Sequence, residues 1–204
     1  MNQRIVPLYP CFRGSRDYVH GTDMYESLAQ LVHSELGLGI ERFLMGIHRF
    51  SSAQPDIHWF EDRDILARPR NATVDFYVST GNRTAFGWLV ESERKVDCRV
   101  EYEENTIAEH CTFSNKSASV LRDPGYRPIE IAVSMTKMLH IRFLPSATGR
   151  WIFTKLELSR MLEAANAATL RVVLRDKLYG RLTRSEIQAE GGTIGSIYFS
   201  LVRA

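Results

Sequence analysis

The stretch from Gly21 to His33, GTDMYESLAQLVH, decides the fold of this chain. Its apolar side chains recur at the spacing of one face of an α-helix. Glycine follows at positions 37 and 39, and glycine is a common residue just after the end of a helix. The sequence therefore predicts one amphipathic helix that ends near residue 37. The apolar side chains of its buried face are Met24, Leu28, Leu31 and Val32.

A second stretch, from Pro128 to His140, carries the same pattern later in the chain. Its His140 stands 107 positions after His33, the residue in the equivalent place of the first stretch. We predict a second helix here, and we expect both histidines to interact with the last carbonyl groups of their helices. A pattern that recurs in this way indicates an internal repeat. The apolar residues of the second helix are Ile131, Met135, Met138 and Leu139.

Sequence typical of β-strands follows each predicted helix, with apolar and polar residues alternating. The loop from 51 to 71, rich in Pro, Asp and Arg, is predicted to be the main insertion of the first copy. These patterns predict an α+β chain built from a duplicated β-α-β-β-β-β unit, with modules at 1–118 and 119–204. A single α+β domain without duplication is the alternative. The predicted strands cover 40–50, 72–78, 98–102 and 106–114, then 151–158, 168–174, 178–187 and 193–200.

The composition excludes several classes of partner. The chain has 204 residues, with 26 Lys and Arg against 24 Asp and Glu. Nucleic-acid-binding proteins usually carry a clear excess of basic residues, which this chain lacks. No stretch approaches the roughly 20 apolar residues of a membrane span, and the first residues do not resemble a signal peptide. Cys11, Cys98 and Cys111 have no metal-binding spacing and cannot all pair within the chain. We therefore expect a cytoplasmic protein in a reducing compartment, with no nucleic acid, membrane or metal bound.

Two motifs resemble the 3-hydroxyacyl-carrier-protein dehydratases of the hotdog superfamily. Glu26 to Gln30, ESLAQ, is similar to the start of that family's helix. Met45 to Phe50, followed by Pro55 and Asp56, is similar to the family's second strand and the turn beyond it. The resemblance implies the hotdog fold, in which an antiparallel sheet wraps around a central helix. Two hotdog copies pair as a dimer or as a fused double hotdog, so we expect two fused modules and allow a homodimer of the whole chain.

The resemblance also implies an activity. It predicts an enzyme of fatty acid or polyketide biosynthesis that acts on an acyl thioester carried by coenzyme A or by an acyl-carrier protein, with no separate cofactor. One departure concerns the chemistry, because the dehydratases have a catalytic histidine in the loop before the helix, where this chain has Phe12 between Cys11 and Arg13. The nearest histidine is His20. This departure favours a thioesterase as the first alternative, and a non-catalytic acyl-binding or assembly subunit is the second.

The candidate active site is the predicted start of the first helix. Unpaired backbone N–H groups and a partial positive charge at a helix start suit a thioester oxygen that becomes negative in the transition state. For dehydration, His20 is the candidate base, and Glu26 or Asp23 is the candidate acid. For hydrolysis, the same carboxylate would activate water or attack the carbonyl carbon. Alternatively, Asp23 and Glu26 form a capping box that stabilises the helix.

Substrate-binding candidates lie in two places. One group adjoins the catalytic candidates at the helix start. The other is a set of arginines in the long loop that would bind the phosphate of a pantetheine carrier or an acidic carrier protein. An ordinary solvated loop is the alternative for these arginines. The candidates are Gly21, Thr22, Tyr25, Arg63, Arg68 and Arg70.

The repeat allows a comparison within the chain. At the offset of 107, His20 corresponds to Arg127, Asp23 to Glu130 and Glu26 to Val133. The second helix thus has the apolar Val133 where the first helix has Glu26, the acid most indicative of catalysis. We therefore predict one active site per chain, on the first helix.

Overall fold

The computed structural model describes residues 3–37, 39–61, 67–145 and 149–202. The chain divides into two compact units, Met1–Tyr102 and Glu103–Ala204. Each unit contains one 16-residue helix and an antiparallel sheet.

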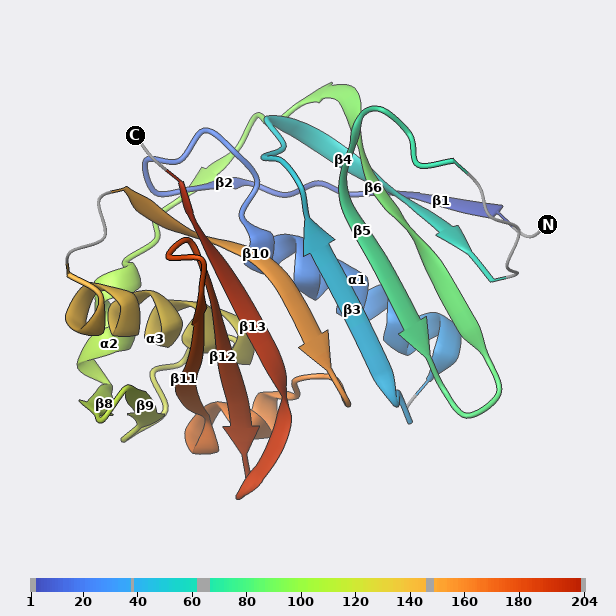
Figure 1. Ribbon diagram of the computed structural model, residues 1–204. Coiled ribbons are helices and arrows are strands. Elements are labelled where there is room, and N and C mark those ends of the chain that lie inside the picture. The colour runs from blue at the N-terminus through green and yellow to red at the C-terminus, as the bar shows by residue number, and fades with distance from the viewer. Residues whose placement is uncertain (1–2, 38, 62–66, 146–148, 203–204) are drawn as a thin grey trace. The chain divides into compact units, whose positions relative to one another are not determined.

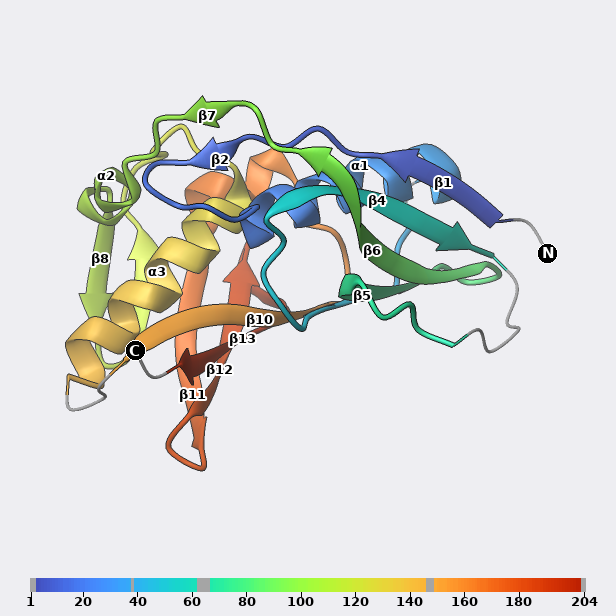
Figure 2. The same ribbon diagram turned by 90° about the horizontal axis from the view of Figure 1, so that it is seen from above.

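The first unit contains α1 (Gly21–Leu36), which begins where the sequence predicts and lies against one face of its sheet (Figures 1 and 2). The buried face of α1 includes Tyr25, whose ring packs edge to face on Phe43 of the sheet. The sheet order is β1-β4-β6-β5-β3, and β2 and β7 form a separate short parallel pair. The strands are β1 (Gln3–Pro7), β2 (Phe12–Arg13), β3 (Arg42–Ile47), β4 (Ala53–Phe60), β5 (Ala72–Ser79), β6 (Thr84–Lys95) and β7 (Arg99–Val100).

The second unit contains α3 (Pro128–Phe143), which confirms the second predicted helix and packs on β9, β10 and β11. Its sheet order is β10-β13-β12-β11-β9-β8. The short helix α2 (Glu104–Glu109) packs beside α3, where Glu104 forms an ion pair with Lys137 at 2.6 Å. The other elements are β8 (Cys111–Ser114), β9 (Ser117–Val120), β10 (Arg150–Leu158), the 3-10 helix η1 (Ala164–Thr169), β11 (Arg171–Leu178), β12 (Leu182–Ala189) and β13 (Gly192–Val202).

The boundary between the units differs from the predicted one between residues 118 and 119. It lies at Tyr102 and Glu103 because β9 pairs with β11, so β8 and β9 belong to the sheet of the second unit. The strand predicted over 106–114 is wrong in its first half, where residues form α2 and bury Ile107 completely. The segment expected to close the first module therefore begins the second unit.

Strands β4 and β6, which together with β5 are the longest strands of the first unit, are missing from the predicted strand ranges, whereas the sequence does predict β5. Strand β4 lies inside the loop predicted at 51–71, and β6 lies between two predicted strands. Strand β4 escapes detection because Pro55 argues against a strand; its pairing with β6 shifts register between Ala53 and Pro55, which accommodates the proline.

The two units also differ in strand order. In the first unit β6, the last long strand, lies between β4 and β5. In the second unit the last strand, β13, lies between β10 and β12. The units share a helix and an antiparallel sheet, but their strands are not arranged as identical copies.

Candidate functional site

The first turn of α1 is built on His20. This residue is the N-cap of the helix, with an extended backbone (φ −73°, ψ 139°), and its carbonyl oxygen accepts hydrogen bonds from the N–H groups of Asp23 and Met24. The preceding Val19 donates its N–H to the carbonyl of Ser51 at 2.8 Å, which holds the entry to the helix beside the start of β4. The local sequence thus places a histidine side chain at the positive end of a 16-residue helix.

The His20 ring is held in one orientation by its neighbours. Its Nδ1 lies 2.7 Å from Oγ1 of Thr22, and its ring centroid lies 5.6 Å from that of Tyr102. His20 is 8% exposed and Thr22 is completely buried. A hydroxyl group on one side and an aromatic ring on the other restrict the rotamer of His20.

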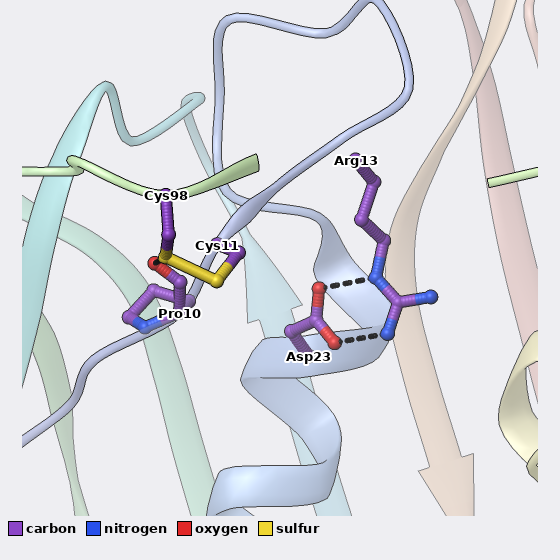
Figure 3. The surroundings of a disulfide bond; sticks show 5 residues. All are labelled: Pro10, Cys11, Arg13, Asp23 and Cys98. Atoms are coloured by element: carbon purple, nitrogen blue, oxygen red, sulfur yellow. Dashed lines mark hydrogen bonds and ion pairs between the residues drawn. A yellow bond between two sulfur atoms is a disulfide. The ribbon is translucent and has the colours of Figure 1, made fainter. Parts of the chain in front are cut away.

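The carboxylate of Asp23 is paired with an arginine. Its two carboxylate oxygens accept hydrogen bonds from Nε and Nη2 of Arg13, at 2.6 and 2.5 Å (Figure 3). Both side chains are largely buried, so this two-fold ion pair is stronger than a surface pair. The predicted capping box of Asp23 and Glu26 is also not formed at the N-cap, which is His20 and has no side-chain capping hydrogen bond.

Arg13 reaches the helix from a covalently closed clip, which we define as residues 11–16 and 98–102. Cys11 and Cys98 form a disulfide within it, shown in Figure 3 beside the Arg13–Asp23 pair. Next to the disulfide, Phe12 donates its N–H to the carbonyl of Cys98, and Gly14 donates to that of Val100. The pairing differs from the expectation of reduced cysteines, since disulfides persist in oxidising compartments and are rare in the cytosol.

The clip also supplies Tyr102. The guanidinium groups of Arg13 and Arg16 lie 5.0 and 5.4 Å from the centre of the Tyr102 ring, within the range of cation–π attraction. Sequence reasoning missed both Arg13 and Tyr102 as parts of this site. The available signal was the position of Arg13 directly after Phe12, which stands where the dehydratases that the sequence resembles carry their loop histidine.

The other predicted residues of the helix start have different environments. Glu26 is half-buried, one turn after Thr22. Gly21 is the first residue of the helix. Tyr25 is 1% exposed and forms part of the core, where its ring packs on Phe43. This burial leaves its side chain inaccessible to a substrate.

The three arginines predicted to bind phosphate, Arg63, Arg68 and Arg70, come well after α1 in the chain. Arg63 falls outside the described residues. Arg68 donates from Nη2 to the carbonyl of Ala72 at 3.1 Å, which ties its loop to the start of β5. The side chain of Arg70 is exposed. A role of these arginines in phosphate binding stays a prediction.

The second unit repeats the acid–arginine pair but not the histidine. Glu130, the counterpart of Asp23, is 4% exposed and accepts hydrogen bonds from both the backbone N–H and the guanidinium of Arg127. This pair forms a capping box at the start of α3. Val133, the counterpart of Glu26, is buried. The acid paired with arginine is therefore a feature of both helix starts, whereas His20 and Glu26 are particular to the first.

None of the helices in the described residues is long and apolar enough to cross a membrane. The described side chains include no group of three or more His, Cys, Asp or Glu that would hold a metal ion.

Comparison with known proteins gives structural relatives. No protein-family model and no curated protein matches the sequence. A candidate thioesterase II from Thermobifida fusca superposes with a TM-score of 0.51 at 12% identity, over 100% of this chain and 93% of the other. The pyran synthase domain from module nine of the sorangicin pathway gives 0.52 at 12% identity, over 99% and 92%. A candidate thioesterase from Novosphingobium aromaticivorans gives 0.52 at 10% identity, over 99% and 95%. At these identities the similarity shows a shared fold.

Proposed function

We propose that this chain, which has the hotdog fold, is an enzyme acting on acyl thioesters carried by coenzyme A or by an acyl-carrier protein. The observation that carries the proposal is the pair His20 and Glu26 at the start of α1, against Arg127 and Val133 at the start of α3. A polar pair that one unit has and the other lacks is expected of an active site, because a purely structural device would serve both helices. We also propose that the two units form a double hotdog with this one active site.

The leading reaction is dehydration of a 3-hydroxyacyl thioester. His20 removes the proton α to the carbonyl, and Glu26 in its protonated form gives a proton to the departing hydroxyl group. The first backbone N–H groups of α1 would stabilise the negative charge that develops on the thioester oxygen. Asp23 is no longer the candidate acid, because Arg13 binds both of its oxygens; we assign it the role of holding the first turn of the helix.

Hydrolysis of the thioester is the second candidate. Two of the similar structures are described as candidate thioesterases, and this chain lacks the loop histidine of the related dehydratases. In this reaction Glu26 would activate a water molecule or attack the carbonyl carbon. The two reactions differ in product, since dehydration gives an enoyl thioester and hydrolysis gives a free thiol.

The test is an assay of the purified chain with 3-hydroxyacyl and saturated acyl thioesters of coenzyme A and of a carrier protein. We expect enoyl product to form from the 3-hydroxyacyl substrates. Release of thiol from the saturated substrates would instead establish the thioesterase. Binding of acyl groups without either product would contradict catalysis and favour an acyl-binding subunit.

Two variants and their controls locate the site. Glu26→Gln and His20→Gln are each expected to lower kcat by roughly 100-fold or more, as is usual for the loss of a general acid or base. Glu35→Gln and His33→Gln change the same residue types near the other end of α1 and are expected to leave kcat unchanged. If the variants at both ends of α1 lower kcat equally, the active site does not lie at the start of the helix.

A further inference from the structure

The clip contacts the candidate site at two points. Arg13 binds both oxygens of Asp23, and Tyr102 packs against the ring of His20. These two residues come from opposite segments of the clip, one before α1 and one after β6. The orientation of the His20 ring and of the first helical turn therefore depends on how firmly the two segments are joined.

The disulfide is the strongest link between these segments. The parallel pairing of β2 and β7 involves two residues on each side, and both residues of β7 are exposed. Such a short two-stranded pairing has little stability of its own in water. The guanidinium of Arg99 adds hydrogen bonds to the carbonyls of Gly14 and Arg16, but these too lie at an exposed position. Cys11 and Cys98, by contrast, are joined covalently across a sequence separation of 87.

We propose that the Cys11–Cys98 disulfide is a redox-dependent control of the active site, with Arg13 and Tyr102 as its positioning residues. The proposal rests on the proposed function. A dithiol reductant breaks the S–S bond, gives two electrons and two protons to form the thiols of Cys11 and Cys98, and closes to its own cyclic disulfide. The clip then opens, Arg13 leaves Asp23, and Tyr102 no longer holds His20. Reoxidation restores the closed clip and the active form.

The first experiment compares turnover before and after reduction. Dithiothreitol is expected to lower kcat by roughly 10- to 100-fold with a smaller change in KM, the size of effect that misplacement of a catalytic group produces. Removal of the reductant and reoxidation restore kcat. Reduction is verified by alkylation: burial raises the pKa of the Cys111 thiol to about 11, so the native reduced protein gains two alkyl groups and the oxidised protein gains none. Equal kcat in both forms overturns the proposal.

Variants separate positioning from general loss of structure. The double variant Cys11→Ser, Cys98→Ser is expected to have the low kcat of the reduced enzyme and no response to dithiothreitol, whereas Cys111→Ser responds as the unchanged chain does. Tyr102→Leu is expected to lower kcat and to shift the pH profile of kcat/KM, and Tyr102→Phe restores both because it keeps the ring against His20. If Tyr102→Phe is as impaired as Tyr102→Leu, the ring does not act through His20 and the proposed role of Tyr102 is wrong.

Amide hydrogen exchange distinguishes failure of this proposal from failure of the proposed function. Reduction is expected to speed exchange at residues 11–16 and in the first turn of α1 while leaving β5 and β12 unchanged. If neither form turns over any thioester, the proposed function fails and exchange alone decides: faster exchange supports control of the helix start by the clip, and unchanged exchange overturns it. If the oxidised enzyme is active and reduction changes neither exchange nor kcat, the function stands and the redox control is wrong.

Discussion

At the first turn of α1, two acids three residues apart have different surroundings. Asp23 is bound through both oxygens to Arg13, and Glu26 is half-buried one turn further. Glu130 at the start of α3 is likewise bound by an arginine, so both units pair the acid at this position with an arginine. The sequence motif drew attention to His20, Asp23 and Glu26 together. It could not separate their environments, because Arg13, the partner of Asp23, lies in β2 outside the helix.

The structural role of Asp23 is testable by its coupling to Arg13. Asp23→Asn leaves the largely buried guanidinium without its carboxylate and is expected to lower the free energy of unfolding by about 2 kcal/mol. Arg13→Gln and the double variant complete a cycle in which the two effects are less than additive. Urea unfolding measures all four proteins. Strict additivity of the two single effects would show that the pair contributes no coupling energy.

The environment of His140 differs from the one predicted from the sequence. It was expected to interact with the last carbonyls of its helix, but its side chain is completely buried, with Nε2 2.7 Å from Oγ1 of Thr183 and its ring stacked on Trp151. The prediction rested only on the position of His140 near the end of its helix. The partner residues come from β10 and β12, and pairing at that distance cannot be read from a local pattern.

Burial of His140 predicts a pH dependence of stability. Desolvation lowers its pKa to about 4, whereas the unfolded chain keeps the ordinary value near 6.5 and binds the proton more readily. The stabilisation is therefore complete above about pH 6.5 and is lost as the pH falls to about 4, by up to about 3 kcal/mol. Urea unfolding at a series of pH values is expected to show this loss, and His140→Gln is expected to remove it. The exposed His33→Gln serves as control, and an unchanged pH profile in His140→Gln would contradict the assignment.

At the scale of elements, helices were easier to predict than strands. The positions of α1 and α3 follow from apolar residues at helical spacing, and both 16-residue helices begin where the pattern begins. The pattern around β4 predicts a loop, because Pro55 lies within it and polar residues follow. The pattern around α2 predicts a strand, because its six residues are too few to show helical spacing. Long-range pairing, which local sequence does not encode, decides these elements.

The pairing of β4 with β6 depends on a glycine. A Cβ atom at Gly87 would lie 1.8 Å from the carbonyl oxygen of His58 and 2.8 Å from the ring of Phe76. Gly87→Ala is therefore expected to lower the free energy of unfolding by about 2 kcal/mol, because the two strands must separate to admit the methyl group. Gly81→Ala, whose Cβ would meet its nearest neighbour at 3.5 Å, is the control. Thermal or urea unfolding of both variants checks this, and equal stabilities would rule out the close approach.

At the scale of the whole molecule, the sequence pointed to two related modules, and the structure has two compact units with one long helix each. The unit boundary and the order of strands could not be predicted, because offsets between repeated patterns give no information on which strand lies beside which. Cysteine count likewise did not predict the disulfide, since Cys11 and Cys98 meet through the parallel pairing of β2 and β7.

The disulfide is expected to stabilise the chain as well as position the site. Closing a loop across a sequence separation of 87 restricts the unfolded chain, and its removal is expected to lower the free energy of unfolding by about 2–4 kcal/mol. Urea unfolding of the oxidised protein and of the Cys11→Ser, Cys98→Ser variant measures the difference. Cys111→Ser provides the comparison at a cysteine outside the bond. Identical midpoints for the oxidised chain and the double variant would show that the two segments are held without the bond.

The most direct measurement for this protein is the rate of dehydration of a 3-hydroxyacyl thioester by the unchanged chain, by Glu26→Gln and by Glu35→Gln. We expect all three proteins to keep the helix, and the two variants remove the same charge at its two ends. We expect enoyl product from the unchanged chain and from Glu35→Gln at equal rates, and a loss of roughly 100-fold or more in Glu26→Gln. Equal rates for Glu26→Gln and Glu35→Gln would contradict an acyl-thioester site at the start of α1.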